Sequence, residues 1–351
     1  MKIMIHQLRE HDLAEADRIF RLAFGTFFGL PDPMSFAGDA DYVRTRYYAD
    51  PSSAHGATIV DNGVGDNSNG NDNRKLVGSN FTANWGSVGF FGPLTVHPDY
   101  WDKGVARSLM EPTMQLFSKW NTKHSGLFTF AQSPKHISLY QKYGFWPYYL
   151  TAVMSKVVSP NRANSVNNES LQWSKYSDVS KREKGSDEHL VADCRRLTTS
   201  IYGGLDLRVE IMSVIRQRLG DIILIWDPDS NNDTSSNNRD ISGFAICQCG
   251  KGTEAGSNTC YIKFAAVRPS TSDNDFLLAA NNFDRLIDAC TTFASQRGLS
   301  RLVAGANTGR RQAYAKMLSK GFRIDMLGVV MQNGNDIGYN RRDVYIMDDW
   351  R

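Results

Sequence analysis

The sequence predicts an α/β (α+β) protein built from two similar halves. Three observations favour this fold class: strand-like and helix-like segments alternate, one pattern of segments occurs twice, and an Asn/Ser-rich stretch separates the two copies. A chain of 351 residues is long enough for about two domains. We therefore expect a domain at residues 1–158, a linker at residues 159–170 and a second domain at residues 171–351.

The repeat rests on two similar segments, YGFWPYYLTAVM and KGFRIDMLGVVM. Gly144 of the first segment corresponds to Gly321 of the second, 177 positions later, and the apolar residues that follow keep the same offset. Upstream, Val96 corresponds to Val267 at an offset of 171, so the second copy contains six additional residues between these points. Duplication of one α/β unit explains the pattern better than chance does.

Each copy is expected to begin with a strand, at residues 83–96 and 261–267, and to continue as helix, strand, helix and a final β-rich run. Steps of four and three residues mark the buried face of the second copy's first helix. That face consists of Phe276, Ala280, Phe283, Ile287, Cys290 and Ala294. The corresponding helix of the first copy uses Val105, Leu109, Met110, Leu116, Phe117 and Trp120, and we expect Pro112 to kink it.

Asn/Ser-rich stretches at residues 64–74, 159–170 and 227–240 cannot bury enough apolar surface to offset their ordering entropy. The first and third lie between strand-like runs and are expected to be expanded hairpin loops. The second is the expected linker.

Composition excludes several classes of function. A net charge of +3 gives no nucleic-acid-binding footprint. No run of about 18 apolar residues and no signal-peptide core occur, so we expect a soluble, cytoplasmic chain without a membrane partner. The five cysteines are expected to be reduced. Cys247, Cys249 and Cys260 share a predicted hairpin, but no His follows at ligand spacing, so buried structural thiols are favoured over a metal site.

The stretch LTVHPDYWDKGVARSL passes from a strand through a short polar loop into a helix. Gly104 can adopt any φ, and consecutive N–H groups at a helix start form a cradle for an anion. Lys103 and Arg107 add positive charge beside it, so the loop favours phosphate binding. A lone glycine at a helix start is usually only a turn, which leaves the loop ambiguous when taken alone.

The segment SPKHISLYQKYGFWP, farther along the chain, changes this interpretation because the two segments together resemble the GNAT superfamily of N-acetyltransferases. Leu94, Val96 and Pro98 match the family's strand, Gly104 and Ala106 its coenzyme A loop, and Tyr140 and Gly144 its later helix. The resemblance implies two GNAT-like domains, each a mixed, mostly antiparallel sheet flanked by helices. It implies acetyl-CoA as co-substrate, no metal, and direct attack by a small primary amine in a ternary complex.

By the same resemblance, Tyr140 is the general acid and the N–H near Val96 stabilises the oxyanion. The residues implied to bind the coenzyme are Leu94, Thr95, Val96, Asp102, Lys103, Gly104, Val105, Ala106, Arg107 and Ser133. Trp101 stands where the family usually has Arg or Gln, and either covers the coenzyme or caps the core. Ser133 replaces a common Asn, and His136 replaces a small residue.

The second copy is expected to be non-catalytic. Its loop, residues 269–276, has no glycine and contains Asp273 and Asp275, which would repel a diphosphate. Met317 stands where Tyr140 stands in the first copy.

The general base is left open. Asp32, Asp39, Asp41, a water chain and a terminal carboxylate at Arg351 remain candidates, whereas His97, just before a turn proline, is more often surface decoration. Aromatic residues fill residues 24–36 and recur at Tyr42, Tyr47 and Tyr48, where the family builds its acceptor pocket; packing on the sheet is the alternative.

A competing hypothesis is a noncatalytic acyl-CoA-binding or partner-binding module. The chain is expected to be a monomer or homodimer. The aromatic segment Gly338–Arg351 is expected to dock as a strand or clasp, between the halves or elsewhere.

Overall fold

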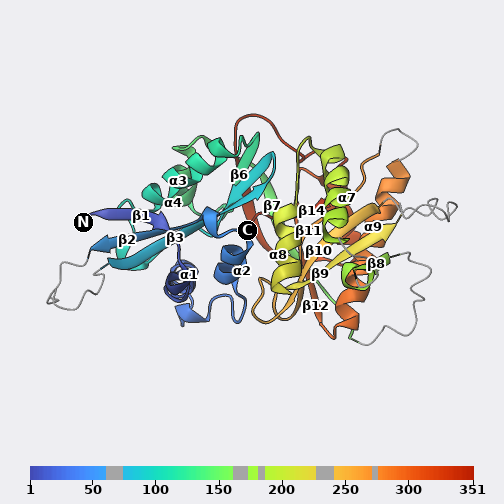
Figure 1. Cartoon of the computed structure of the whole chain (residues 1–351), viewed down its shortest axis with the longest axis horizontal. Helices are drawn as coiled ribbons and strands as arrows, with labels where there is room; N and C mark the ends of the chain where they lie inside the picture. The colour runs from blue at the N-terminus through green and yellow to red at the C-terminus, as the bar shows by residue number, and fades with distance from the viewer. Residues whose placement is uncertain (61–73, 161–172, 181–185, 227–240, 271–275) are drawn as a thin grey trace.

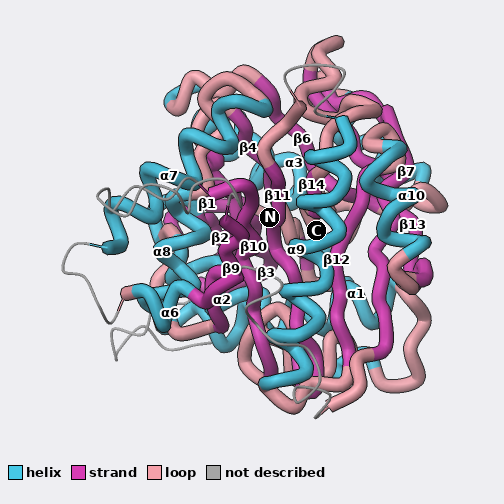
Figure 2. Tube along the Cα trace, turned by 90° about the vertical axis from the view of Figure 1, so that its right-hand side faces the viewer, coloured by secondary structure: helices cyan, strands magenta, loops and turns pink. Residues whose placement is uncertain are grey.

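The computed structural model describes residues 1–60, 74–160, 173–180, 186–226, 241–270 and 276–351. The described strands form one 14-stranded sheet that runs through the whole molecule, with helices on both faces (Figures 1 and 2). Its order is β1-β2-β3-β4-β6-β13-β7-β12-β11-β10-β9-β8, with β5 paired to β3 and β14 paired to β11.

The helix, strand, helix and final strand of the first half agree with the predicted pattern, but the single strand expected at residues 83–96 is wrong: the chain turns after residue 85 and forms separate strands at 88–91 and 95–96. The strands are β1 (Ile3–Gln7), β2 (Ala54–Val60), β3 (Arg74–Trp85), β4 (Val88–Phe91), β5 (Thr95–Val96), β6 (His124–Thr129) and β7 (Phe145–Val157). The helices are α1 (Leu13–Phe27), α2 (Tyr42–Ala49), α3 (Val105–Lys119) and α4 (Pro134–Gln141), with a short 3₁₀ turn, η5 (Pro98–Tyr100), before α3.

The second half follows a similar order. Its strands are β8 (Trp173–Lys175), β9 (Gly220–Trp226), β10 (Ile241–Gly250), β11 (Gly256–Val267), β12 (Arg301–Asn307), β13 (Arg323–Asn333) and β14 (Ile346–Met347). Its helices are α6 (Tyr176–Val179), α7 (Ser186–Ile201), α8 (Arg208–Gln217), α9 (Phe276–Gln296) and α10 (Arg311–Ser319). The predicted linker lies outside the described residues from residue 161 on.

The predicted fold class is confirmed: the sheet is mixed and mostly antiparallel. Most neighbours are antiparallel, and the two parallel pairs, β4 with β6 and β11 with β12, take corresponding places in the two halves. Strands β2 and β3 pair antiparallel, as do β9 and β10, in agreement with the two predicted hairpins. The segments that connect each pair lie outside the described residues.

The central strands of the sheet are exchanged between the halves. β13, which ends the second half's α/β unit, lies between β6 and β7 of the first half. β7 in turn lies between β13 and β12 of the second half. Thr151 pairs directly with Gly328, and these residues are 177 positions apart, the offset of the predicted repeat. The two strands are therefore related by an approximate two-fold rotation about this pair.

Helices cover both faces because the strands are apolar on both sides. In the second half, α9 and α10 cover one face and α7 and α8 the other (Figure 2). In the first half, α1 and α2 pack on one face through Leu76, whereas α3 packs on the other through Val77. Apolar residues of this kind, removed from water on both faces, supply the main driving force for folding.

The predicted helix faces agree with the structure. In α3, Val105, Leu109, Met110 and Phe117 are buried. Pro112 lies inside α3 without ending it. In α9, Phe283, Ile287, Cys290 and Ala294 are fully buried and Ala280 partly so, whereas the side chain of Phe276 lies outside the description.

All five cysteines are free, in agreement with the expectation of reduced thiols, and four of them are buried. In the described part of the chain, no three His, Cys, Asp or Glu side chains are grouped so that they could hold a metal ion. No described helix has the length and apolar character needed to cross a membrane.

Candidate functional site

The site begins where a strand leaves its neighbour. β4 runs parallel to β6 from Val88 to Phe91, and the chain then continues as β5, which pairs with β3 instead. Beyond Leu127, the edge of β6 on this side has no partner among the described strands. We call this opening between β5 and β6 the first splay.

A main-chain donor faces the first splay. The N–H of His97 donates to Val77 of β3 at 2.9 Å. Because successive N–H groups of a strand point in opposite directions, the N–H of Val96 is turned away from β3 and into the splay. This is the donor predicted to stabilise an oxyanion.

The loop after η5 presents a row of free donors. Gly104 precedes α3 with φ +84°, and Asp102 also has a positive φ, of +62°. Within the described residues, nothing accepts a hydrogen bond from the main-chain N–H groups of Asp102 through Arg107. Lys103 and Arg107 are exposed beside this row. The helix dipole and the free donors together make the loop a site for an anion.

Trp101 braces this loop. Its indole N–H donates to the main-chain oxygen of Val96 at 2.7 Å, and its ring is partly buried against the core beneath α3. Lys135 of α4 lies 5.6 Å from the ring centroid and pairs with Asp102 at 2.7 Å. Trp101 therefore ties the loop to β5, the strand whose Val96 N–H points into the first splay. The sequence analysis did not assign this bracing role to Trp101.

Tyr140 and Ser133 lie on α4, next to the first splay. Tyr140 is 7% exposed and packs edge-on against Phe91, with ring centroids 5.6 Å apart. Burial raises its pKa above the ordinary value of 10.0, so the hydroxyl stays protonated. Ser133 is the buried N-cap residue of α4. The structure thus brings the predicted acid, the loop and Val96 to one end of the same pair of strands.

The candidate groups for a general base have partners elsewhere, including Arg351, whose main-chain oxygen accepts a hydrogen bond from Arg46. Asp32 and Asp41 accept hydrogen bonds from the main chain at the starts of short helices. Asp39 accepts hydrogen bonds from Ser257 of the second half. The interpretation of His97 as a surface residue is wrong: His97 is buried, which lowers its pKa, and its Nδ1 accepts from the N–H of Asp99. These contacts give each group a structural role.

The aromatic segment packs mainly on itself. Phe24, Phe27 and Phe28 of the α1 end surround Phe130, with ring centroids 5.0–6.0 Å away. Phe36 stacks on Phe28, so these rings contact mainly one another, and Phe28 remains 38% exposed. The packing alternative therefore describes most of these rings.

An open cavity of about 270 Å³ lies beside this cluster, and we call it the junction cavity. Its wall combines the segment before α2, strands from both halves and the last residue of the sequence. The lining residues used below are Tyr42, Glu254, Tyr261, Arg301, Asp325 and Arg351. Phe128 of β6 packs against neighbouring wall residues, so the cavity lies on the α1 face of the sheet.

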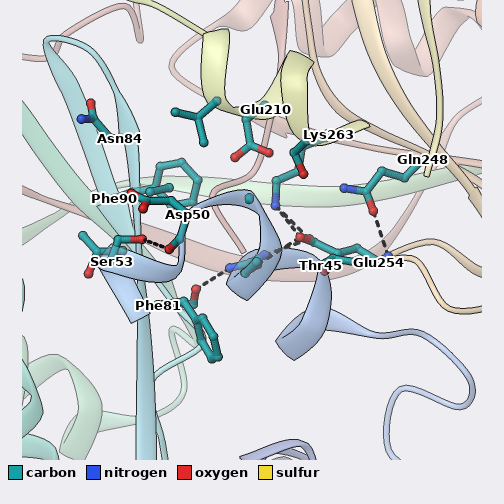
Figure 3. Close-up of a pocket in the computed structure, with 17 residues that line it drawn as sticks. Thr45, Asp50, Ser53, Phe81, Asn84, Phe90, Glu210, Gln248, Glu254 and Lys263 are labelled. Atoms are coloured by element: carbon teal, nitrogen blue, oxygen red, sulfur yellow. Dashed lines mark hydrogen bonds and ion pairs between the residues drawn. The ribbon is translucent and has the colours of Figure 1, made fainter. Parts of the chain in front are cut away.

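A buried charge network connects this cavity with the end of β4. Arg46 of α2 donates to Gly92 O at 2.5 Å and to Glu254 at 2.9 Å, and Glu254 accepts from Lys263 at 2.8 Å. Figure 3 shows the carboxylate of Glu254 turned toward the ammonium of Lys263. Burial alone would raise the pKa of Glu254, but the two cations outweigh it and lower this pKa to about 2.

A second cavity, of about 30 Å³, borders the same network and has room for water only (Figure 3). The sequence analysis did not find this network. Arg46 and Glu254 are 208 positions apart, and neither occurs in a motif.

The corresponding splay of the second half is filled. β11 leaves β12 after Ile262, and β14 then pairs with β11, Ile346 opposite Ala266 and Met347 opposite Ala265. The N–H of Val267, which corresponds to Val96, donates to Tyr345 O at 3.3 Å. The segment Gly338–Arg351, predicted to dock as a strand or clasp, docks through the two-residue strand β14 and the loop residues on either side of it. We call the opening that it fills the second splay.

Side chains at corresponding positions hold this strand. Ser133, the N-cap residue of α4, has its counterpart 177 positions later in Arg310, the N-cap residue of α10. Arg310 is fully buried and donates to Asp348 at 2.6 Å. Met317, the counterpart of Tyr140, is also fully buried and carries no proton to donate. The loop residues Asp273 and Asp275 lie outside the described residues.

Residues 40–145 match the Acetyltransferase (GNAT) family. No curated protein matches the sequence.

Solved structures resemble almost the whole chain. A proposed acetyltransferase from Pyrococcus horikoshii is 14% identical with a TM-score of 0.59, and the match covers 98% of this chain and 93% of that one. A GCN5-related N-acetyltransferase from Sphaerobacter thermophilus is 14% identical with a TM-score of 0.55, covering 97% and 98%. A GCN5-related N-acetyltransferase from Anabaena variabilis is 15% identical with a TM-score of 0.51, covering 94% and 72%. This protein therefore contains an acetyltransferase domain of the GNAT family, within a fold that it shares with GNAT proteins over almost its whole length.

Proposed function

We propose that this protein is an acetyl-CoA-dependent N-acetyltransferase that acts on a small primary amine and has one reaction site, in the first half. GNAT acetyltransferases typically use acetyl-CoA as co-substrate. The observation that carries the proposal is the row of six free N–H groups at Asp102–Arg107, next to a splay into which Val96 directs a further N–H.

The loop donors suit the diphosphate of the coenzyme, and the N–H of Val96 suits its thioester. The loop N–H groups, with Lys103 and Arg107, hold the diphosphate. The main chain of Leu94, Thr95 and Val96 lies along the carrier arm, and Val105, Ala106 and Ser133 line its path. Small Ala106 and Gly104 allow the main chain to approach the phosphates closely.

The thioester, when bound, supplies an activated acyl group. The N–H of Val96 donates to the oxygen that becomes negative when the amine attacks the carbonyl carbon. Because this donor is fixed by the strand, no reorganisation is needed as the charge develops. Loss of one such donor typically costs about 10²–10³ in rate.

Tyr140 gives its proton to the departing thiolate. Burial keeps its hydroxyl protonated over the pH range in which amines lose their protons. The same apolar surroundings raise the proton affinity of the thiolate, because both anions are poorly solvated there. The amine reaches the site through the junction cavity and releases its proton to water, since the acidic candidates have other partners.

The second half does not take part in the chemistry. Its splay is filled by Tyr345–Met347, and Arg310 and Met317 replace the residues that would face a coenzyme. Its role is to complete the sheet and the wall of the junction cavity.

Titration with acetyl-CoA tests the coenzyme site. One equivalent is expected to bind per chain. The variant Gly104→Asp places a carboxylate and a strained φ in the loop and should abolish binding. Gly298→Asp is a matched control, because Gly298 also has a positive φ, +71°, with open space around it. Two equivalents per chain, or equal binding by both variants, would contradict the proposal.

The variant Tyr140→Phe tests the chemistry. We expect kcat with a panel of amines to fall by about 10²-fold or more, with unchanged acetyl-CoA binding. Tyr176→Phe is the control, because Tyr176 is also a buried tyrosine but its hydroxyl donates to Ser186 at 2.7 Å, in the second half. Saturable acetyl-CoA binding with no transfer to any amine would favour the noncatalytic binding module.

A further inference from the structure

The residues after β14 reach the junction cavity because two glycines make room for them. A Cβ at Gly305 of β12 would lie 2.2 Å from the Cβ of Asp349. A Cβ at Gly126 of β6 would lie 2.3 Å from Trp350 Cζ3. The chain therefore follows one defined path from the second splay, across the sheet, to the junction cavity, where Figure 1 marks its end between the halves.

This path fixes the position of Arg351. Its guanidinium carbon lies 4.4 Å from the centroid of the Tyr261 ring. Its Nε lies 3.1 Å from Oδ2 of Asp349. The other carboxylate oxygen, Oδ1, accepts a hydrogen bond from Tyr261 at 3.0 Å. Arg46 donates to the main-chain oxygen of Arg351. The guanidinium is thus held by its surroundings while it lines the junction cavity.

This guanidinium has hydrogen-bonding capacity left. Its Nε is buried and makes no hydrogen bond of good geometry in the described structure, since the contact with Asp349 is an ion pair only. The side chain is 19% exposed, and Arg351 belongs to the lining of the cavity. A partly desolvated guanidinium with free donors favours a carboxylate, which it can bind through two parallel hydrogen bonds.

The charges around the cavity agree with an anionic ligand group. Arg301 pairs with Asp325 at 2.7 Å, and Arg351 pairs with Asp349. Glu254 is shared by two cations, Arg46 and Lys263. Of these side chains, Arg301, Arg351, Glu254 and Asp325 line the cavity itself, whereas Arg46, Lys263 and Asp349 lie behind its wall, and Arg46 and Lys263 already neutralise Glu254. The cavity is also small, about 270 Å³, which suits an acceptor of amino-acid size.

We propose that Arg351, carried to the junction cavity by the strand in the second splay, recognises a carboxylate of the acceptor, so that the acceptor is a small amine of the amino-acid class. This inference rests on the proposed acetyl transfer. It makes Arg351 a specificity-determining residue and assigns the second splay the task of placing it.

Matched acceptors test the inference. L-phenylalanine and phenethylamine differ by one carboxylate, as do L-methionine and 3-(methylthio)propylamine. With the intact protein, kcat/KM should be at least about tenfold higher for each amino acid than for its partner. Equal values, or a preference for the partner amine, would overturn the inference and leave acetyl transfer standing.

Variants locate the effect. Arg351→Met should remove the preference by raising KM for the amino acids, with little change in kcat/KM for the partner amines. Arg351→Lys keeps the positive charge but not the two parallel N–H donors of the guanidinium, and should retain part of the preference for amino acids. Lys320→Met is the control for loss of a charge, because Lys320 pairs with Asp288 at 2.7 Å on α9 and does not line the cavity.

Titration of each variant with acetyl-CoA distinguishes failure of the inference about Arg351 from failure of the proposed function. If Arg351→Met binds acetyl-CoA normally and keeps the wild-type preference, the inference is wrong. If no variant and no wild-type protein binds acetyl-CoA, the proposed function itself fails. If acetyl-CoA binds but no acceptor is turned over, thermal stabilisation by L-phenylalanine is measured. Its presence in wild type and loss in Arg351→Met support the inference, and its absence in wild type overturns it.

Discussion

At the scale of single residues, one position separates the two halves. Ser133 begins α4 with a small side chain beside an open splay, whereas its counterpart Arg310 begins α10 with a fully buried guanidinium bound to Asp348. A buried guanidinium must be paired to be tolerated. Arg therefore occupies this position in the half whose splay is filled by a segment that carries a carboxylate, and Ser occupies it in the half whose splay is open.

His124 is another residue whose surroundings decide its behaviour. It is fully buried at the start of β6, among the rings of Tyr202, Tyr339 and Trp350, with centroids 5.6–6.4 Å away. Neither ring nitrogen has a hydrogen-bond partner in the described structure. Burial lowers its pKa from the ordinary value of 6.5, although the nearby Asp336 opposes this.

This lowered pKa predicts a loss of stability in acid. Below pH 6.5 the unfolded chain binds a proton at His124 that the folded chain does not, so the free energy of unfolding falls as the pH falls through this range. His124→Leu should remove up to about 1.4 kcal/mol per pH unit of this dependence. Urea denaturation at pH 5.0 and 7.5 measures the difference.

The exposed His189 supplies the control. His189→Leu should keep the wild-type pH dependence of the free energy of unfolding. The other buried histidines contribute equally in the wild type and in both variants. An unchanged pH dependence in His124→Leu would mean that this ring is already charged in the folded protein.

Sequence patterns located some site residues and missed others. Tyr140, Gly104 and Val96 belong to local motifs, and the family resemblance that these motifs carry implied one common site. Arg46 and Glu254 meet only because the two halves pack against each other, and a contact over 208 positions leaves no local pattern. The bond from Trp101 to Val96 was also hidden, because it depends on the turn that η5 makes.

At the scale of elements, the loop before α3 depends on that bond for its position. Trp101→Phe keeps the apolar contact but removes the donor, so the loop loses its tie to the main chain of Val96. We expect the free energy of unfolding to fall by about 1 kcal/mol. Acetyl-CoA binding should weaken several-fold, because the N–H row must then be ordered on binding.

Calorimetric titration and thermal unfolding measure these two effects. Trp120→Phe is the matched control: Trp120 packs against Phe117 at the other end of α3, with ring centroids 6.3 Å apart, and has no contact with the loop. Equal coenzyme affinity in Trp101→Phe and wild type would show that the loop is ordered without this brace.

The helices and most strands were predictable because their signals are local. The stripes of α3 and α9 recur with helical spacing, and the strands β2, β3, β9 and β10 are apolar runs bounded by polar stretches. The partners of β7 and β13 were not predictable in this way. Both strands are equally suited to either neighbour, and their choice follows from the packing of the whole sheet.

At the scale of the whole molecule, the exchange of β7 and β13 joins the halves. Each of these strands pairs on both edges, and both of its partners belong to the other half. A half produced alone would therefore leave this strand unpaired on both edges and expose an edge of a second strand, β6 or β12. We expect residues 1–160 and 173–351, expressed separately, to unfold without cooperativity or to aggregate.

Circular dichroism and size-exclusion chromatography check this expectation. As a control, a chain with a protease site inserted between residues 164 and 165 is cut after folding; its two pieces should stay together and keep their unfolding midpoint. A separate piece of residues 1–160 that unfolds cooperatively and binds acetyl-CoA would contradict the prediction.

The exchanged strands also set an order of events on the ribosome. Synthesis proceeds from the N-terminus, and β6 and β7 emerge long before residues 323–333, which separate them in the finished sheet. During that interval the nascent chain carries two apolar strands without their final neighbour, a state open to mispairing. Translation speed and chaperone supply should thus govern the yield of active protein more strongly than they do for a protein whose first domain closes by itself.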